Sequence, residues 1–149
     1  MTVFSENKKV YFDYEILETF EAGLVLSGAE VKSIKNGRMN LLGSYVNFHN
    51  GELYLINASI APYQPKNQPP DYDPQRSRKL LLKKKEIGYL AGKIKQKGLT
   101  LVPTKVYNKG RRIKIEIGLA RGKKQYDKRE AISKRETARQ IGQIIKKES

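Results

Sequence analysis

Six of the ten residues from Arg76 to Lys85 are Arg or Lys, and three leucines, Leu80 to Leu82, interrupt them. Guanidinium groups bind phosphate through paired hydrogen bonds and ammonium groups bind it as point charges, so such a row is typical of a nucleic-acid groove. The leucines can anchor the segment to a core or contact a base or ribose. The alternative is an exposed basic strand whose leucines are core. The segment predicts contact with RNA or DNA.

A second basic segment runs from Gly122 to Arg129 and has one aromatic residue, Tyr126, in its middle. The ring could stack on an unpaired base while the cations around it bind phosphates, a typical combination in RNA recognition. The alternative is the start of an ordinary helix, with Asp127 as the N-cap and the cations solvated. These two interpretations are compatible with each other.

The charge of the whole chain supports a polyanionic partner. Residues 1–75 contain six Lys and Arg against nine Asp and Glu, whereas residues 76–149 contain twenty-four against six, a net charge of +18. Such a charge attracts an extended anion over roughly a Debye length, about 8–10 Å in ordinary salt. Among extended anions, nucleic acid fits this pattern best.

Residue types that usually carry catalysis or bind metals form no convincing cluster. The chain has no Cys, and its one His, His49, stands beside an expected turn, where a solvated residue is the default. Glu15, Glu18 and Glu21 are three apart, a spacing that divides them between the two faces of a strand. No nucleophile with a base and an orienting group can be assembled. We therefore expect a non-enzymatic protein without a metal site or a cofactor.

The elements that position the basic segments are mostly strands. Aromatic and β-favouring residues mixed with acids predict a strand over 11–18. Asn50-Gly51 between two apolar runs predicts a hairpin over 45–56, because a type I′ turn needs positive φ at both central residues. A second hairpin is expected over 99–119, around a turn at 108–110, with one face buried and the other solvated.

Two helices and one long loop separate these strands. A short helix is expected over 30–35, with Gly37 placed to end it. Apolar residues at i, i+3, i+4 and i+7 predict an amphipathic helix over 86–97, closed by Gly98. Residues 61–74 hold five of the six prolines, so a surface loop is expected there.

This order of elements predicts a mainly β domain at residues 1–120, folded as a small closed antiparallel OB-like barrel with short accessory helices. Residues 121–149 form a basic tail with few apolar side chains, expected to be disordered when free. Ile141, Ile144 and Ile145 lie at helical spacing, so the tail could become helical against a partner. The apolar runs fall far short of the roughly 18 residues of a membrane span, and we expect a cytoplasmic protein.

Short motifs from Asn7 to Arg129 resemble, in order and spacing, those of the SmpB family, the SsrA-binding proteins of bacteria. The motifs are Asn7-Lys8-Lys9, Phe20-Glu21-Ala22-Gly23, Gly28-Ala29-Glu30-Val31-Lys32-Ser33, Asn40-Leu41, Gly51-Glu52, the run from Arg76 to Leu82, Lys97-Gly98, Gly122-Lys123-Lys124 and Asp127-Lys128-Arg129. The resemblance implies an OB-type barrel that binds the tRNA-like domain of transfer-messenger RNA. It also implies delivery of that RNA to stalled ribosomes in trans-translation, with the tail in the decoding region of the small subunit.

The resemblance and the basic run together define the expected site residues. Those expected to bind RNA are Asn7, Lys8, Lys9, Glu21, Arg76, Arg78, Lys79, Leu81, Lys83 and Lys84. Those expected to bind the ribosome are Gly122, Lys123, Lys124, Tyr126, Asp127, Lys128, Arg129, Ile144 and Ile145. Four residues depart from the family pattern: Phe12 and Tyr126 stand where His is common, Lys83 where Asn is common, and Thr137 where Trp is common. The alternatives are a structural ribosomal protein and a general RNA-binding OB protein.

Overall fold

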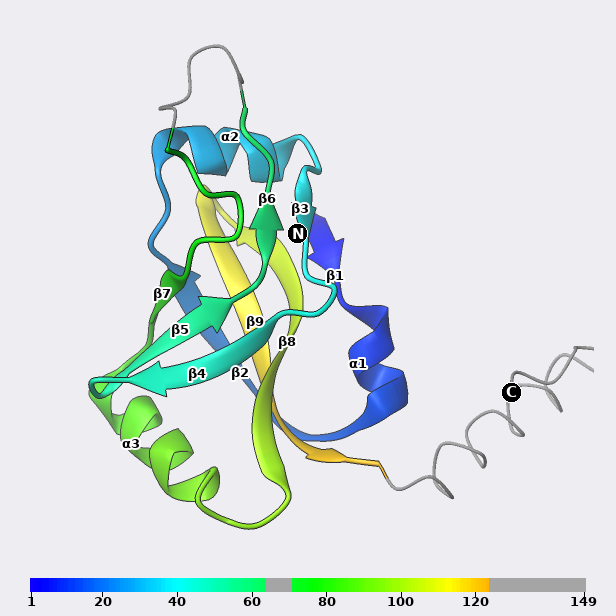
Figure 1. Cartoon of the computed structure of the whole chain (residues 1–149), viewed down its shortest axis with the longest axis vertical. Helices are drawn as coiled ribbons and strands as arrows, with labels where there is room; N and C mark the ends of the chain where they lie inside the picture. Colours follow the sequence, from blue (N-terminus) through cyan, green and yellow to red (C-terminus); the bar gives the residue numbers. More distant parts are fainter. Residues whose placement is uncertain (64–70, 124–149) are drawn as a thin grey trace, which may run out of the picture.

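The computed structural model describes residues 1–63 and 71–123. They form a mainly β domain with three short helices (Figure 1). The strands are β1 (Val3–Glu6), β2 (Tyr14–Leu24), β3 (Met39–Asn40), β4 (Tyr45–His49), β5 (Glu52–Ile56), β6 (Ser59–Ile60), β7 (Arg78–Leu81), β8 (Leu99–Lys109) and β9 (Arg112–Gly122). The helices are α1 (Lys8–Asp13), α2 (Gly28–Lys35) and α3 (Lys84–Lys93). Within this part of the chain, none of the helices is long and apolar enough to cross a membrane.

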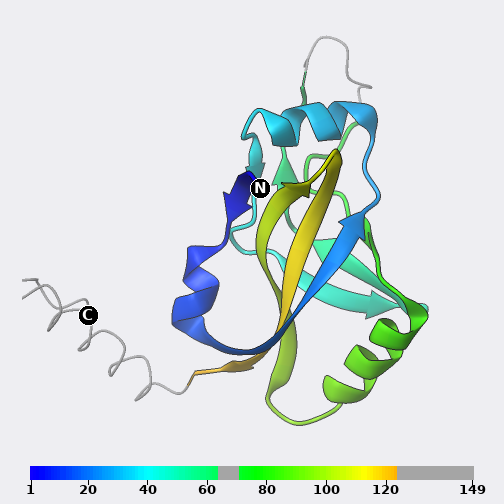
Figure 2. The same cartoon turned by 180° about the vertical axis from the view of Figure 1, so that it is seen from behind.

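Seven strands form one antiparallel sheet in the order β1-β8-β9-β2-β7-β5-β4, and β3 pairs with β6 separately. Figure 2 looks onto the side where β2, β9 and β8 lie next to one another. The sheet curves around the core, but among the described strands no ladder joins β1 to β4. The expected closed barrel is therefore not observed. On that side β1 contacts β3, which pairs with β6 in the separate two-stranded sheet.

The core fills the inside of this curve, and α2 and α3 lie at its two ends (Figure 1). Large, fully buried side chains come from the central strands and from both helices: Leu53 and Leu55, Leu80, Ile115 and Ile117, Ile34 and Leu90. At about 25 cal/mol per Å² of apolar surface removed from water, burial of this kind is the main force that holds the strands together. The outer face of the sheet is thus left to carry the functional groups.

The N-terminal segment differs from the expectation. Residues 11–13, expected as the start of a strand, are the last turn of α1, and β2 begins only at Tyr14. Val10 of α1 packs against Val102 and Ala120, so the β8–β9 hairpin is buried on both faces there rather than on one. The sequence pattern predicted a strand here because α1 has only six residues and one buried side chain, and is too short to show a helical period.

The local signals elsewhere are confirmed. Asn50 and Gly51 have φ of 51° and 77° in the turn of the β4–β5 hairpin. The expected short helix is α2, which begins at Gly28, two residues earlier than expected, after a capping box formed by Ser27 and Glu30. Gly37 follows its end, as expected, with φ of 75°. The amphipathic helix is α3, which begins two residues earlier and ends four residues earlier than expected. The second hairpin turns one residue later than expected, since Lys109 pairs with Arg112.

Two expectations concern residues that the structure describes only in part. The central residues 64–70 of the expected loop lie outside the described residues, as do residues 124–149 of the tail. β9 continues to Gly122, so the last sheet residues lie two positions beyond the expected domain limit at 120. The backbone N–H of Lys123 then donates to the carbonyl of Asp13 at 2.9 Å, which holds the end of β9 against the start of β2.

Candidate nucleic-acid interface

Glu21 and Leu81, sixty residues apart in the sequence, meet on the outer face of the sheet. Gly23 of β2 is the ladder partner of Leu81 in β7, and Glu21, two residues before Gly23, points to the same side. The side chain of Leu81 is 52% exposed although its neighbour Leu80 is fully buried. A Cβ on Gly23 would lie 3.3 Å from the Cβ of Leu81. A glycine at position 23 therefore lets an exposed leucine lie directly over β2.

Glu21 is held as a carboxylate by two neighbours on β8. The hydroxyl of Tyr107 donates to its Oε1 at 2.7 Å, and the ammonium of Lys109 lies 3.3 Å from its Oε2. The hydrogen bond from Tyr107, followed by the contact with Lys109, lowers the pKa of Glu21. Burial and this same hydrogen bond raise the pKa of Tyr107. Glu21 is thus an oriented acceptor at the rim of a hollow of about 500 Å³ that Lys105 and Glu116 also line.

Cations that the sequence analysis did not single out lie beside Leu81. A hollow of about 280 Å³ is lined by Leu81 and Gly23 together with Arg111, Arg112 and Lys114. Lys114 is the ladder partner of Gly23, and the two arginines stand at the turn between β8 and β9. The sequence carried a signal for them, because four of the six residues from Lys109 to Lys114 are basic. Their proximity to Leu81 depends on pairing across three strands.

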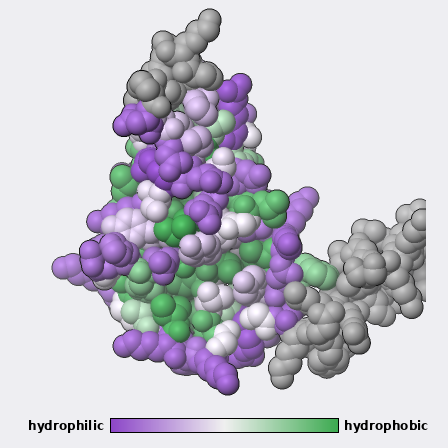
Figure 3. Space-filling view, viewed as in Figure 1, coloured by the Kyte–Doolittle hydropathy of each residue, from purple (hydrophilic) through white to green (hydrophobic). Residues whose placement is uncertain are grey.

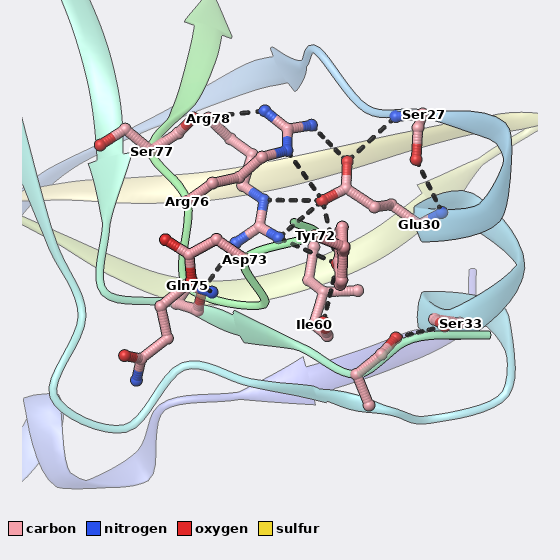
Figure 4. A network of polar contacts seen from close by, with 12 residues as sticks. Ser27, Glu30, Ser33, Ile60, Tyr72, Asp73, Gln75, Arg76, Ser77 and Arg78 are labelled. Atoms are coloured by element: carbon pink, nitrogen blue, oxygen red, sulfur yellow. Dashed lines mark hydrogen bonds and ion pairs between the residues drawn. The ribbon is translucent and has the colours of Figure 1, made fainter. Parts of the chain in front are cut away.

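Arg78, expected to bind phosphate, is instead fully buried and serves the fold (Figure 4). Its Nη2 lies 2.6 Å from Oε2 of Glu30, and its Nη1 donates to the carbonyl of Ala58 at 2.8 Å. Since no solvent reaches its guanidinium group, the prediction of an RNA contact at Arg78 is wrong. Strand alternation explains the error: Arg78 and Leu80 share the inner face of β7.

Arg76 binds the same carboxylate but keeps part of its side chain in solvent. Its Nε donates to Oε2 of Glu30 at 3.1 Å, and its Nη2 forms an ion pair with Oε1. The hydroxyl of Tyr72 lies 3.3 Å from Glu30 and donates to the carbonyl of Ile60 at 2.8 Å. Burial alone would raise the pKa of Glu30, but hydrogen bonds from Arg76, the Ser27 N–H and Arg78 outweigh it and lower the pKa to about 2. We call Glu30, Tyr72, Arg76 and Arg78 the Glu30 network.

Asn7 is also a structural residue. Its side chain is buried, and its Nδ2 donates to the carbonyls of Leu41 and Pro103 at 3.4 and 3.3 Å. Its own N–H donates to the carbonyl of Thr104 at 2.7 Å. Asn7 therefore ties the start of α1 to two other segments, and its contact with RNA stays a prediction. A buried amide looks the same as an exposed one in a sequence.

The remaining expected residues that the structure describes divide into three groups. Lys79, Lys83 and Lys84 lie on β7 and at the start of α3, next to the outer face that carries Glu21 and Leu81, which we call the Glu21–Leu81 face. Lys83 and Lys84 are exposed. Lys79 is part-exposed, and its ammonium lies 3.7 Å from the carboxylate of Glu52. Lys8 and Lys9 are exposed on α1, and no described contact brings them to the Glu21–Leu81 face. At the end of β9, Nζ of Lys123 donates to the carbonyl of Tyr11 at 3.1 Å, next to the exposed Gly122. The described residues do not include Lys124, Tyr126, Asp127, Lys128, Arg129, Ile144 and Ile145.

The comparisons with known proteins agree with one another. The profile of the family described as SmpB protein matches residues 4–147. The SsrA-binding protein of Carboxydothermus hydrogenoformans is 53% identical over 144 residues, which cover 97% of this chain and 96% of that protein. The SsrA-binding protein of Chloroflexus aurantiacus is 52% identical over 145 residues, covering 97% and 91%. A solved structure, "tmRNA-SmpB: a journey to the center of the bacterial ribosome", matches at 51% identity with a TM-score of 0.66, covering 85% of this chain and 92% of that chain.

The fold defines a small, mainly β protein. The outer surface of its sheet combines the exposed Leu81, the oriented carboxylate of Glu21 and several cations. The sequence matches cover nearly the whole length of this chain and of its relatives. The chain belongs to the SmpB family.

Proposed function

We propose that this chain binds the tRNA-like domain of transfer-messenger RNA and brings that RNA to stalled ribosomes in trans-translation. Relatives at 52–53% identity are named SsrA-binding proteins, and the similar solved structure concerns transfer-messenger RNA and SmpB at the bacterial ribosome. The structural observation that carries the proposal is the meeting of Glu21 and Leu81 on one exposed face.

This face offers three kinds of contact to folded RNA. The exposed Leu81 can cover a base or a ribose, and the ionised Glu21 can accept hydrogen bonds from ribose hydroxyls or base amino groups. Arg111, Arg112 and Lys114 on one side of Leu81 and Lys79, Lys83 and Lys84 on the other supply charge for phosphates. A carboxylate beside a polyanion is unfavourable unless it accepts hydrogen bonds, so Glu21 gives selectivity rather than affinity.

The other parts of the proposal concern the tail and the protein's mode of action. Residues 124–149 would become helical on the ribosome and enter the decoding region, which gives the protein one surface for each of two RNAs. The protein acts by binding, without catalysis of its own, in the cytoplasm where ribosomes translate. An OB-like origin of the curved sheet belongs to the same proposal, since a seven-stranded antiparallel sheet wrapped around one core fits that architecture.

A competition experiment tests the proposal. The full chain is titrated with labelled tRNA-like domain in the presence of an ordinary RNA hairpin of equal length, at two salt concentrations. We expect the tRNA-like domain to bind much more tightly at both, because purely electrostatic binding would not distinguish the two RNAs. Equal affinity for both would contradict the proposal. Stoichiometric presence on all ribosomes of growing cells would instead favour a structural ribosomal protein.

A further inference from the structure

A third hollow, of about 370 Å³, lies on the outer side of the β4–β5 hairpin, away from Glu21. It is lined by Asn47 and His49 of β4, Tyr54 and Ile56 of β5, and Ser77 just before β7. The rings of His49 and Tyr54 meet edge to face, with centroids 6.1 Å apart and an interplanar angle of 68°. In Figure 3, the face that carries this hairpin shows hydrophobic surface bordered by hydrophilic side chains. The hollow thus combines an aromatic wall with polar groups.

Strand β7 connects this hollow to the Glu21–Leu81 face. Leu81, Lys79 and Ser77 alternate with the buried Leu80 and Arg78, so all three point outward. Lys79 is the ladder partner of Tyr54, as Leu81 is the partner of Gly23. The distance from Leu81 to Ser77 along the strand is about 14 Å, at roughly 3.4 Å per residue. A single molecule that covers Leu81 can therefore reach the hollow by passing over Lys79.

We propose that this hollow receives one unpaired nucleotide of the RNA that binds the Glu21–Leu81 face, with the base stacked on Tyr54 and its phosphate beside Lys79. The inference rests on the proposed function, since it takes the RNA to be already bound next to it. Of the residues that line the hollow, only Ser77 lies in a segment that the sequence analysis connected with RNA.

The chemistry of the hollow suits a nucleotide in three respects. A volume of about 370 Å³ is at the lower end of the range for small-ligand sites and accommodates a base with part of its ribose. The Asn47 amide and the Ser77 hydroxyl have no side-chain hydrogen-bond partner among the described residues, so both can bind a base edge or a ribose hydroxyl. Lys79 supplies a cation, since its ion pair with Glu52 is long, at 3.7 Å, and exposed.

Binding and cross-linking measurements on the full chain test this inference. The affinity of labelled tRNA-like domain is measured for the wild-type protein and for Tyr54→Leu, which keeps apolar bulk but removes the ring. We expect binding about tenfold weaker, the usual effect of one lost base–aromatic stack. Tyr54→Phe keeps the ring and should bind within twofold of wild type. Tyr45→Leu is the control, because Tyr45 is a tyrosine on the same hairpin, more exposed than Tyr54, that does not line this hollow.

A second variant and a second readout cover the case in which Tyr54→Leu does not fold. Ser77→Glu changes an exposed residue and places a negative charge in the hollow, so it should also weaken binding. A 4-thiouridine RNA hexamer, irradiated with wild-type protein, should cross-link to peptides containing His49 or Tyr54. Cross-links confined to other peptides, or equal affinities for Tyr54→Leu, Ser77→Glu and Tyr45→Leu, would overturn the inference. A wild-type chain that fails to select the tRNA-like domain overturns the proposed function instead, and the hexamer cross-links then decide the hollow separately.

Discussion

Replacing Glu30 by Gln should destabilise the fold by about 3 kcal/mol at neutral pH. The side chain of Glu30 is 1% exposed and that of Arg78 is 0% exposed, so the substitution leaves a buried cation without its counter-charge. Breaking such a pair usually costs about 3–5 kcal/mol. The linkage between protonation of Glu30 and folding gives a similar loss of stability. The pKa of Glu30 falls from an ordinary 4.5 to about 2, and a difference of about 2.5 pH units corresponds to about 3 kcal/mol.

The pH dependence of unfolding gives the sharper test. Because the folded-state pKa of Glu30 is depressed, its contribution is complete above pH 4.5 and is lost as the pH falls from 4.5 toward 2. Urea unfolding across this range should show a steep loss of stability in wild type and a shallower loss in Glu30→Gln. The control is Glu15→Gln, since Glu15 and Arg121 form an exposed pair at 3.5 Å that contributes at most about 1 kcal/mol. If both variants lose the same stability at pH 7, the network does not stabilise the fold as argued.

Three further predictions concern the RNA face and the tail. Leu81→Ala should weaken binding of the tRNA-like domain about fivefold, because RNA would cover the half of this side chain that is exposed in the free protein. The melting temperature should change little. Leu42→Ala, which truncates an exposed leucine elsewhere, should leave RNA binding unchanged. Neutralising Arg111 and Arg112 together should lower the slope of log affinity against log salt by about 1.4–1.8, and an unchanged slope would place both in solvent. A chain ending at Lys123 should bind the isolated tRNA-like domain almost normally yet fail to support tagging in reconstituted translation, so normal tagging would contradict the role of the tail.

The features of the fold that the sequence predicted are those set by near neighbours. The Asn50-Gly51 turn and the helix end at Gly37 depend on residues within a few positions, so their signals are complete in the local sequence. The helix α1 and the open edge between β1 and β4 are different. Helix α1 buries only Val10, and its helical form follows from a hydrophobic patch made by Val102 and Ala120, about ninety residues later or more. A contact with residues so distant in the sequence leaves no periodic pattern in the sequence of the helix itself.

The candidate site divides in the same way. The identity of Glu21 and Leu81 as site residues came from motifs, but their meeting depends on the register that pairs Gly23 with Leu81. Arg78 was assigned to RNA because it stands in a basic run, and its actual partner is Glu30, forty-eight residues earlier. Conversely, Arg111 and Arg112 stand in a short basic segment, Lys109 to Lys114, that the sequence analysis treated only as a hairpin turn, and they join the face through three-strand pairing. Charge is visible in a sequence, whereas burial is not.

The Glu30 network also makes the chain between β6 and β7 a place where foreign sequence can be inserted. The N–H of Ile60 donates to the carbonyl of Pro74 at 3.0 Å, and the Tyr72 hydroxyl donates back to the carbonyl of Ile60, so the residues on either side of 64–70 are already joined. Doubling the length of a loop whose ends are held costs only about 0.6 kcal/mol. A peptide epitope or a small fluorescent tag placed between Tyr63 and Asp71 should therefore leave the sheet intact. Such a tag would allow the protein to be followed in living cells without altering either of its termini.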